Sequence, residues 1–270
     1  QAVFAGLRYG NRRLRGTEND TWTAKVPAAR AKVQQLQTEL NALRKKHALR
    51  PPLASVQTES FEPVLTQSVR MKIAATANGA AASIYEFEAW TPQKQNAALA
   101  TTGAVPSASS FALANQTRHF ENLTDGSVDR RQSFPWVSAS GGPAWFRIDF
   151  PKPVTLQSIT WHNGSSVPAD YVIEVLQADD VWLPVAHTRD RLPRTDDQRA
   201  PATVKLTGLD AEQVKALMTH IGQLRAAQRE LARLNAGPQT FAANFAAPDP
   251  TWLLRRGDPM QRLEELPPSI

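Results

Sequence analysis

The stretch "SVRMKIAATANGAAASIYEFEAW", residues 68–90, decides the fold. Its two ends, "VRMKI" and "SIYEFEAW", alternate apolar and polar residues, and a segment rich in Ala and Gly lies between them. Alternation with a period of two residues is typical of strands that bury one face. The stretch therefore predicts two strands of an antiparallel sheet.

The same alternation returns further along the chain. Four segments between residues 144 and 188 show it: "AWFRIDF", "LQSITWHN", "DYVIEVLQ" and "VWLPVAHT". Gly, Pro, Asn and Asp separate these short runs, as turns do in a β-sandwich. We expect a sandwich over residues 54–208.

Two helical segments flank this region, at residues 25–50 and 209–235. Each carries apolar residues on a seven-residue repeat: Val26, Ala29, Val33, Leu36, Leu40 and Leu43 in the first, Val214, Leu217, Ile221, Leu224 and Leu231 in the second. Such a repeat makes a narrow apolar seam that suits one partner helix. The interpretation we favour is an antiparallel two-helix coiled-coil hairpin with the sandwich inserted at its tip. The alternative is that each helix packs separately on a larger core.

The fold class expected from these patterns is α+β. Residues 1–24, with no sustained period, are interpreted as the end of a preceding domain and a loop, and residues 236–270 as the start of a following domain. Because no run of 18 apolar residues occurs, the sequence predicts no membrane-spanning helix.

The net charge and the absence of cysteine bear on which functions are expected. The net charge is +6, but the basic residues are scattered, and the densest group, "LRKKHALR", ends a helix, where cations complement the helix dipole. We therefore predict no binding to nucleic acid. Cysteine is absent, which removes disulfides, thiolate metal sites and a C-x-x-C-H haem attachment.

Catalytic motifs are missing as well. The sequence contains no G-x-S-x-G, no H-E-x-x-H and no phosphate-binding Gly loop, and its five histidines are scattered. We therefore expect a protein that is not an enzyme. In "HTRDR", residues 187–191, the expected role of Asp190 is an ion pair with an Arg at a strand end. "RGD", residues 256–258, is interpreted as a structural turn.

Several motifs together carry a family resemblance. "NAALATTGAVPSASSF", "HFENLTDGSVDRRQSFPWVS", "AWFRIDFPKPVTLQSITWHN" and "DYVIEVLQADDVWLPV" resemble the coagulation factor V/VIII type C domain, which is the discoidin or galactose-binding-like family. The resemblance covers roughly residues 65–195. The strands "VRMKI" and "YEFEAW" come last in that family and first here. The resemblance therefore implies a circularly permuted jelly roll.

The two flanks resemble a narrower group. "QAVFAGLRYGNRRL" and "PTWLLRRGDPMQRLEELPPSI" are similar to the joints of planctomycete-type extracytoplasmic proteins, which pair two domains of unknown function, often beside a cytochrome-c-like domain. This implies a periplasmic or secreted location and flanking domains of the same longer chain as partners. The haem motif itself does not occur in the sequence.

The discoidin resemblance also implies a structural Ca²⁺ at the "DG" loop. The candidate ligands are carboxylates and loop carbonyls, the oxygen donors that this hard cation prefers: Asp125, Asp129, Glu86, Asn122 and Ser127. A second interpretation stays open, in which "DG" is only a turn and Arg130 and Arg131 pair with the acids.

The ligand class that the resemblance implies is carbohydrate, bound by loops at the rim of the sandwich. The candidate contacts are one aromatic and three polar side chains: Trp136, Arg118, His119 and His162. We expect Trp145 and Trp161 in the core, since large aromatics dominate burial in a sandwich. The predicted function is non-catalytic carbohydrate binding within a larger extracytoplasmic protein. The alternative is a structural spacer or docking module with no sugar ligand.

Overall fold

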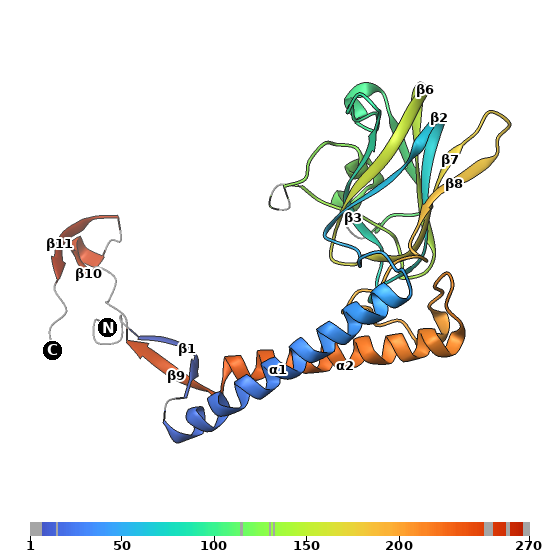
Figure 1. Ribbon diagram of the computed structural model, residues 1–270. Coiled ribbons are helices and arrows are strands. Elements are labelled where there is room, and N and C mark those ends of the chain that lie inside the picture. Colours follow the sequence, from blue (N-terminus) through green and yellow to red (C-terminus); the bar gives the residue numbers. More distant parts are fainter. Residues whose placement is uncertain are drawn as a thin grey trace. The chain divides into compact units, whose positions relative to one another are not determined.

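The computed structural model describes residues 7–14, 16–113, 116–129, 131, 133–245, 251–257 and 260–266. The chain divides into two compact units, one made of residues 1–35 and 226–270 and the other of residues 36–225. Two long helices and antiparallel strands make up these units (Figure 1), so the expected α+β class is confirmed. Among the described residues, no helix is both long and apolar enough to cross a membrane.

The second unit contains one hydrogen-bonded sheet, which has seven strands in the described part of the chain. They are β2 (Val56–Thr76), β3 (Ser83–Trp90), β4 (Val105–Ala108), β5 (Trp136–Val137), β6 (Ala144–Asn163), β7 (Pro168–Leu176) and β8 (Trp182–His187). The order is β5-β3-β6-β2-β7-β8, with β4 also paired to β6. All of these pairings are antiparallel, as the alternating segments predict.

The two longest strands, β2 and β6, each contribute to both layers of a sandwich (Figure 1). Their register shifts at Ser60/Val64 and again at Thr66/Ser68, and such bulges bend a strand. On one side of the shifts, β6 also pairs with β3. On the other side, β6 pairs with β4 and β2 pairs with β7, which in turn pairs with β8. Rings from the two halves meet in the core: Phe87 packs on Phe146 at 4.9 Å and Trp161 on Tyr171 at 5.1 Å. The expected sandwich is therefore present.

Two expectations about tryptophan need correction. Trp145, expected in the core, is 42% exposed, because it alternates along β6 with the buried Phe146 and so faces outward. Trp136, expected as a ligand contact at the rim, is fully buried, and its indole N–H donates to the Ser110 carbonyl at 2.9 Å. The ring of Trp136 therefore faces the core instead of a ligand. Trp161 is fully buried, as expected.

The first helix, α1 (Thr17–Lys46), begins earlier than the expected residue 25. Gly16, at φ 96°, precedes it, and Asp20 lies in the first turn, where a negative charge complements the dipole. The second helix, α2 (Ala211–Ala236), is followed by Gly237 in the left-handed conformation that commonly ends helices. The bounds of α2 are close to the expected residues 209–235, whereas α1 both begins and ends earlier than the expected residues 25–50.

Contacts between α1 and α2 occur in both units. In the second unit, His220 Nε2 lies 2.8 Å from the Leu36 carbonyl oxygen, and seam residues are buried there: Leu36, Leu40, Val214, Leu217, Ile221 and Leu224. In the first unit, the Arg233 guanidinium lies 4.3 Å from the centre of the Trp22 ring. In the second unit, the buried seam residues of α1 and α2 thus lie where the two helices contact each other.

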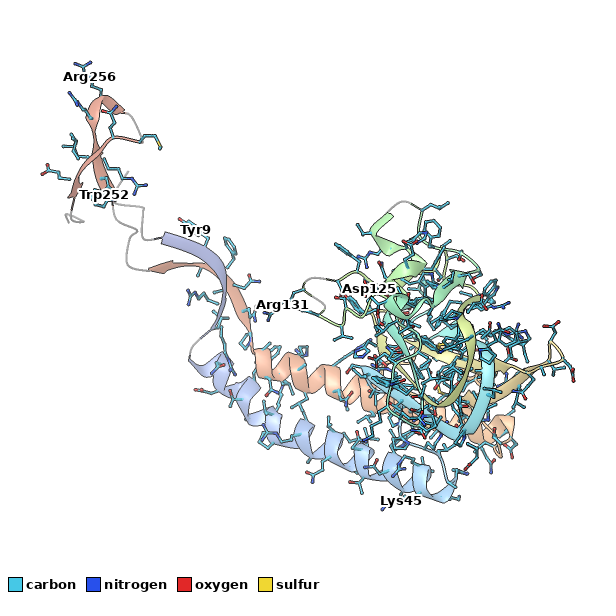
Figure 2. All side chains as sticks on the ribbon, turned by 90° about the horizontal axis from the view of Figure 1, so that it is seen from above. Tyr9, Lys45, Asp125, Arg131, Trp252 and Arg256 are labelled. Atoms are coloured by element: carbon cyan, nitrogen blue, oxygen red, sulfur yellow. The ribbon has the colours of Figure 1, made fainter. Side chains whose placement is uncertain are left out.

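The first unit also contains paired strands, and the one within residues 1–24 lies where the sequence suggested a loop. β1 (Leu7–Arg13) pairs with β9 (Gln239–Phe245), and β10 (Thr251–Leu254) pairs with β11 (Arg262–Leu266). Figure 2 labels Tyr9 on the first pair and Trp252 on the second. A short 3-10 turn, Arg255–Gly257, contains the first two residues of the "RGD" tripeptide, in line with the expected turn. Asp258 lies outside the described residues.

Candidate functional site

A partly buried ionic network joins the segment just after α1 to the sandwich. Glu59 on β2 accepts hydrogen bonds from Arg50, from Arg191 at 2.9 Å and from the Tyr171 hydroxyl. Arg50 also donates to Asp190 at 2.6 and 2.7 Å. Asp190 does pair with an arginine, as expected, but the partner lies 140 residues away in the sequence. All four charges and the phenol are mutually satisfied, so the network fixes the sandwich on the helix end.

Ionisation in this network follows from its burial and charges. Burial raises the pKa of Tyr171, and the adjacent Glu59 carboxylate raises it further. Burial works against ionisation of Asp190, but the hydrogen bonds from Arg50 outweigh it and hold the pKa of Asp190 below its usual range. Tyr171 therefore remains a hydrogen-bond donor, and Asp190 remains a carboxylate.

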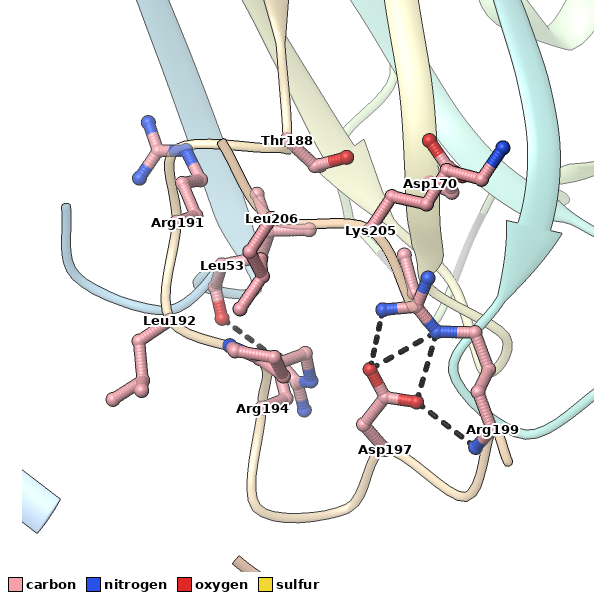
Figure 3. Close-up of a pocket in the computed structure, with 12 residues that line it drawn as sticks. Leu53, Asp170, Thr188, Arg191, Leu192, Arg194, Asp197, Arg199, Lys205 and Leu206 are labelled. Atoms are coloured by element: carbon pink, nitrogen blue, oxygen red, sulfur yellow. Dashed lines mark hydrogen bonds and ion pairs between the residues drawn. The ribbon is translucent and has the colours of Figure 1, made fainter. Parts of the chain in front are cut away.

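A small depression beside this network is structural (Figure 3). Asp197 and Arg199 form a buried ion pair at 2.7 Å in its wall, and Arg194 donates to the Leu53 carbonyl at 2.9 Å. Its volume of about 20 Å³ is enough for roughly one water molecule. The size is too small for a sugar or a cofactor.

Two of the candidate metal ligands meet at the edge of the sandwich. Glu86 on β3 is fully buried, and one carboxylate oxygen accepts the Gly126 N–H at 3.1 Å. The other oxygen, Oε1, has no hydrogen-bond partner. Burial and the neighbouring Asp125 carboxylate raise the pKa of Glu86 to about 9. Asp125 lies on the loops outside the strands (Figure 2) and accepts the Ser127 N–H at 2.7 Å.

The remaining candidate metal ligands make local hydrogen bonds. The Asp129 carboxylate accepts the Arg131 N–H at 3.0 Å, and the Asn122 amide donates to the Thr117 carbonyl at 2.7 Å. Arg130 lies outside the described residues. Within the described ranges, no group of three or more His, Asp or Glu side chains is arranged to hold a metal ion. The structure thus brings together Glu86, Asp125 and Ser127.

The candidate sugar contacts lie in separate places. His119 begins a 3-10 turn, Phe120–Leu123, and its ring packs on Phe111 at 4.4 Å. Together with Leu113 and Glu121 these two residues line an open depression of about 500 Å³. Arg118 ends the preceding 3-10 turn, Gln116–Arg118.

His162 lies on β6 and not on these 3-10 turns. It is opposite Glu86 in the strand ladder, with its Nε2 3.7 Å from a Glu88 oxygen. The structure thus links His162 to the carboxylates of β3, whereas His119 lies at the depression.

Sequence reasoning missed a group on the outer face of the sheet. Five side chains surround a shallow depression of about 160 Å³: Arg70, Lys72, Trp145, Arg147 and Trp182. We call this group the outer-face patch. The sequence does indicate this patch: Trp145 is two and four residues from the polar Arg147 and Asp149, and alternate residues of a strand lie on the same face.

Comparison with protein-family models, with curated proteins and with solved structures gives no match for this chain.

Proposed function

We propose that the sandwich is a non-catalytic carbohydrate-binding module. The observation that carries this proposal is the open depression lined by Phe111, Leu113, His119 and Glu121, which we call the rim depression. It combines the aromatic ring of Phe111 with the imidazole of His119 and the carboxylate of Glu121. Sugar sites need an apolar surface for the ring and a few polar groups for the hydroxyls, and loops on a rigid scaffold commonly supply both. The resemblance to discoidin domains supports the same ligand class.

Each residue would have a simple role. Phe111 offers an apolar surface, and its packing against the core residues holds it in place. The Glu121 carboxylate, on an exposed side chain, accepts hydrogen bonds from sugar hydroxyls. The His119 ring is held by Phe111 and by the Glu121 N–H, which donates to its Nδ1 at 3.5 Å, so its Nε2 is left to bond a ligand.

The test is a glycan-array screen of the whole chain, followed by titration of the best glycan. We expect saturable binding that falls about tenfold or more in His119→Ala, since a contact at the centre of a small site carries much of the affinity. His47→Ala, near the end of α1, is the matched control and keeps full affinity. Absence of binding to a broad panel by the folded protein would contradict the proposal.

A spacer role is the second candidate, and one observation favours it. Both helices are tied to the sandwich, α1 through Arg50 and α2 through Arg225, which donates to the Asp197 carbonyl at 2.9 Å. A sandwich held in this way suits a rigid connection between flanking domains of a longer extracytoplasmic protein, presented on a coiled-coil hairpin. Failure of the glycan screen would leave this role as the better account.

We also propose that Glu86 and Asp125 hold a structural Ca²⁺. The partnerless, buried Glu86 Oε1 beside a second carboxylate fits a divalent cation, which would hold Glu86 ionised against the burial and the Asp125 charge that otherwise keep it protonated. Two carboxylates alone do not complete a calcium shell, so loop carbonyls or water would supply the remaining oxygen ligands. The ion would fix the "DG" loop against β3.

Calcium is therefore expected to stabilise the sandwich. At a concentration about a hundred times the dissociation constant, Ca²⁺ adds about 2.7 kcal/mol to the free energy of unfolding, which differential scanning calorimetry detects as a higher Tm than in EDTA. Glu86→Gln removes this rise. Glu88→Gln, on the same strand but paired with His162, retains it. Equal Tm values of the unaltered protein in Ca²⁺ and in EDTA would argue against the site.

A further inference from the structure

The outer-face patch presents two tryptophans of one sheet, on β6 and β8, with β2 and β7 between these strands. Trp145 on β6 is opposite Lys72 on β2, and Trp182 on β8 is opposite Leu176 on β7. Trp145 is 42% exposed although it stands on a regular strand. An indole that is 42% exposed leaves much of its apolar surface unused by the fold, and exposed apolar groups that gather on one face commonly mark a binding site.

Two arginines are held in fixed positions beside these rings. The Arg70 guanidinium lies 3.9 Å from the centre of the Trp182 ring, and that of Arg147 lies 5.4 Å from it. Arg70 also pairs with Glu174 and Arg147 with Asp149, each at 2.6 Å. Stacking and ion pairing together orient the planar groups before any ligand arrives, which lowers the entropic cost of binding.

Lys72 is the least constrained cation of the patch. Its ammonium nitrogen lies 3.3 Å from a Glu174 oxygen, and its side chain is 51% exposed. Glu174 already accepts the shorter hydrogen bond from Arg70 at 2.6 Å. Lys72 can therefore turn to an anion above Trp145 at little cost, since its own side chain is half exposed and Glu174 keeps its pairing with Arg70.

The charge balance indicates the ligand. Arg70, Lys72 and Arg147 supply three positive charges, and Glu174 and Asp149 supply two negative ones, which leaves one in excess. A nucleic acid carries a phosphate at every nucleotide and would meet both carboxylates. A chain of uronate sugars also carries one negative charge per ring, but its hydroxyls can donate to the half-exposed Asp149 carboxylate, so it fits better.

We propose that the outer-face patch is a second binding site, which takes an acidic polysaccharide built from uronate sugars. Trp145 contacts the apolar face of a sugar ring, and Trp182 holds the guanidinium groups of Arg70 and Arg147 beside it. Lys72 and Arg147 bind the carboxylates of the chain between them. This site is separate from the rim depression at His119, so it stands whether or not the rim binds a neutral sugar.

The test uses the whole chain and polygalacturonate as the probe, with isothermal titration calorimetry in low salt. We expect binding that weakens about tenfold or more in Trp145→Ala, with an unchanged Tm, and that Trp145→Tyr largely restores. Lys72→Gln weakens the interaction with polygalacturonate, and added NaCl weakens it too because exposed charges are screened. Phe134→Ala, which removes another exposed aromatic ring, leaves the affinity unchanged.

Three results would overturn the proposal. One is no binding to polygalacturonate by the folded protein. The second is equal affinity of Trp145→Ala and the unaltered chain. The third is tighter binding to single-stranded DNA than to polygalacturonate with the same dependence on Trp145, which would assign the patch to another ligand class. His119→Ala keeps affinity for polygalacturonate, so failure of the rim site and failure of this site give different results.

Discussion

Replacing Glu59 with Gln is expected to lower the free energy of unfolding by about 3–5 kcal/mol, the usual cost of breaking a buried ion pair by removing one partner. Glu59 accepts hydrogen bonds from Arg50, Arg191 and Tyr171, and its side chain is almost completely buried. Gln keeps the size but not the charge. Arg191, itself buried, then keeps a positive charge with no counter-ion. Urea unfolding followed by tryptophan fluorescence measures the change.

Glu62→Gln is the matched control for this experiment. Glu62 stands on the same strand but is exposed, so its substitution changes the free energy of unfolding by no more than about 0.5 kcal/mol. Equal stability of the two variants would show that Glu59 does not anchor the helix end to the sandwich.

The second large effect is expected at Phe146. Its ring is fully buried and packs edge-on against Phe87 at 4.9 Å and Trp136 at 5.3 Å. Phe146→Ala removes these contacts and leaves a cavity, which costs about 3–5 kcal/mol. Thermal and urea unfolding both report the loss.

The neighbouring residue provides the control. Trp145→Ala deletes a larger side chain one position earlier, yet costs no more than about 0.5 kcal/mol because the indole faces solvent. If Trp145→Ala destabilised the protein as much as Phe146→Ala, the assignment of the two faces of β6 would be wrong.

Strand alternation predicted much of the sandwich. "VRMKI" and "AWFRIDF" became parts of β2 and β6, and their apolar residues line the core. The error at Trp145 came from treating a large aromatic as core by its type. The position of Trp145 on β6 determines its exposure, since Arg147 and Asp149 lie on the same face of the strand.

Pairings between residues far apart in the sequence could not be predicted from strand alternation. β1 and β9 pair residues from opposite ends of the chain, and Glu59 meets Arg191 across 132 positions. No local pattern encodes such partners, because pairing depends on how the whole chain returns on itself. Glu86 and Asp125 were predicted together only through the family resemblance. The arrangement around His119 depends on the packing of Phe111, which spacing does not specify.

The shared strands β2 and β6 have a consequence for the order of folding. Val56 aligns with His162 and Ile73 with Ala144, so neither layer is complete until segments far apart in the sequence have met. Closing such long loops costs entropy before any pairing compensates for it, and sheets of this kind form slowly. The helices need only contacts within one turn. We therefore expect helical structure to precede the sandwich as the chain collapses, and both layers to appear together in a later step.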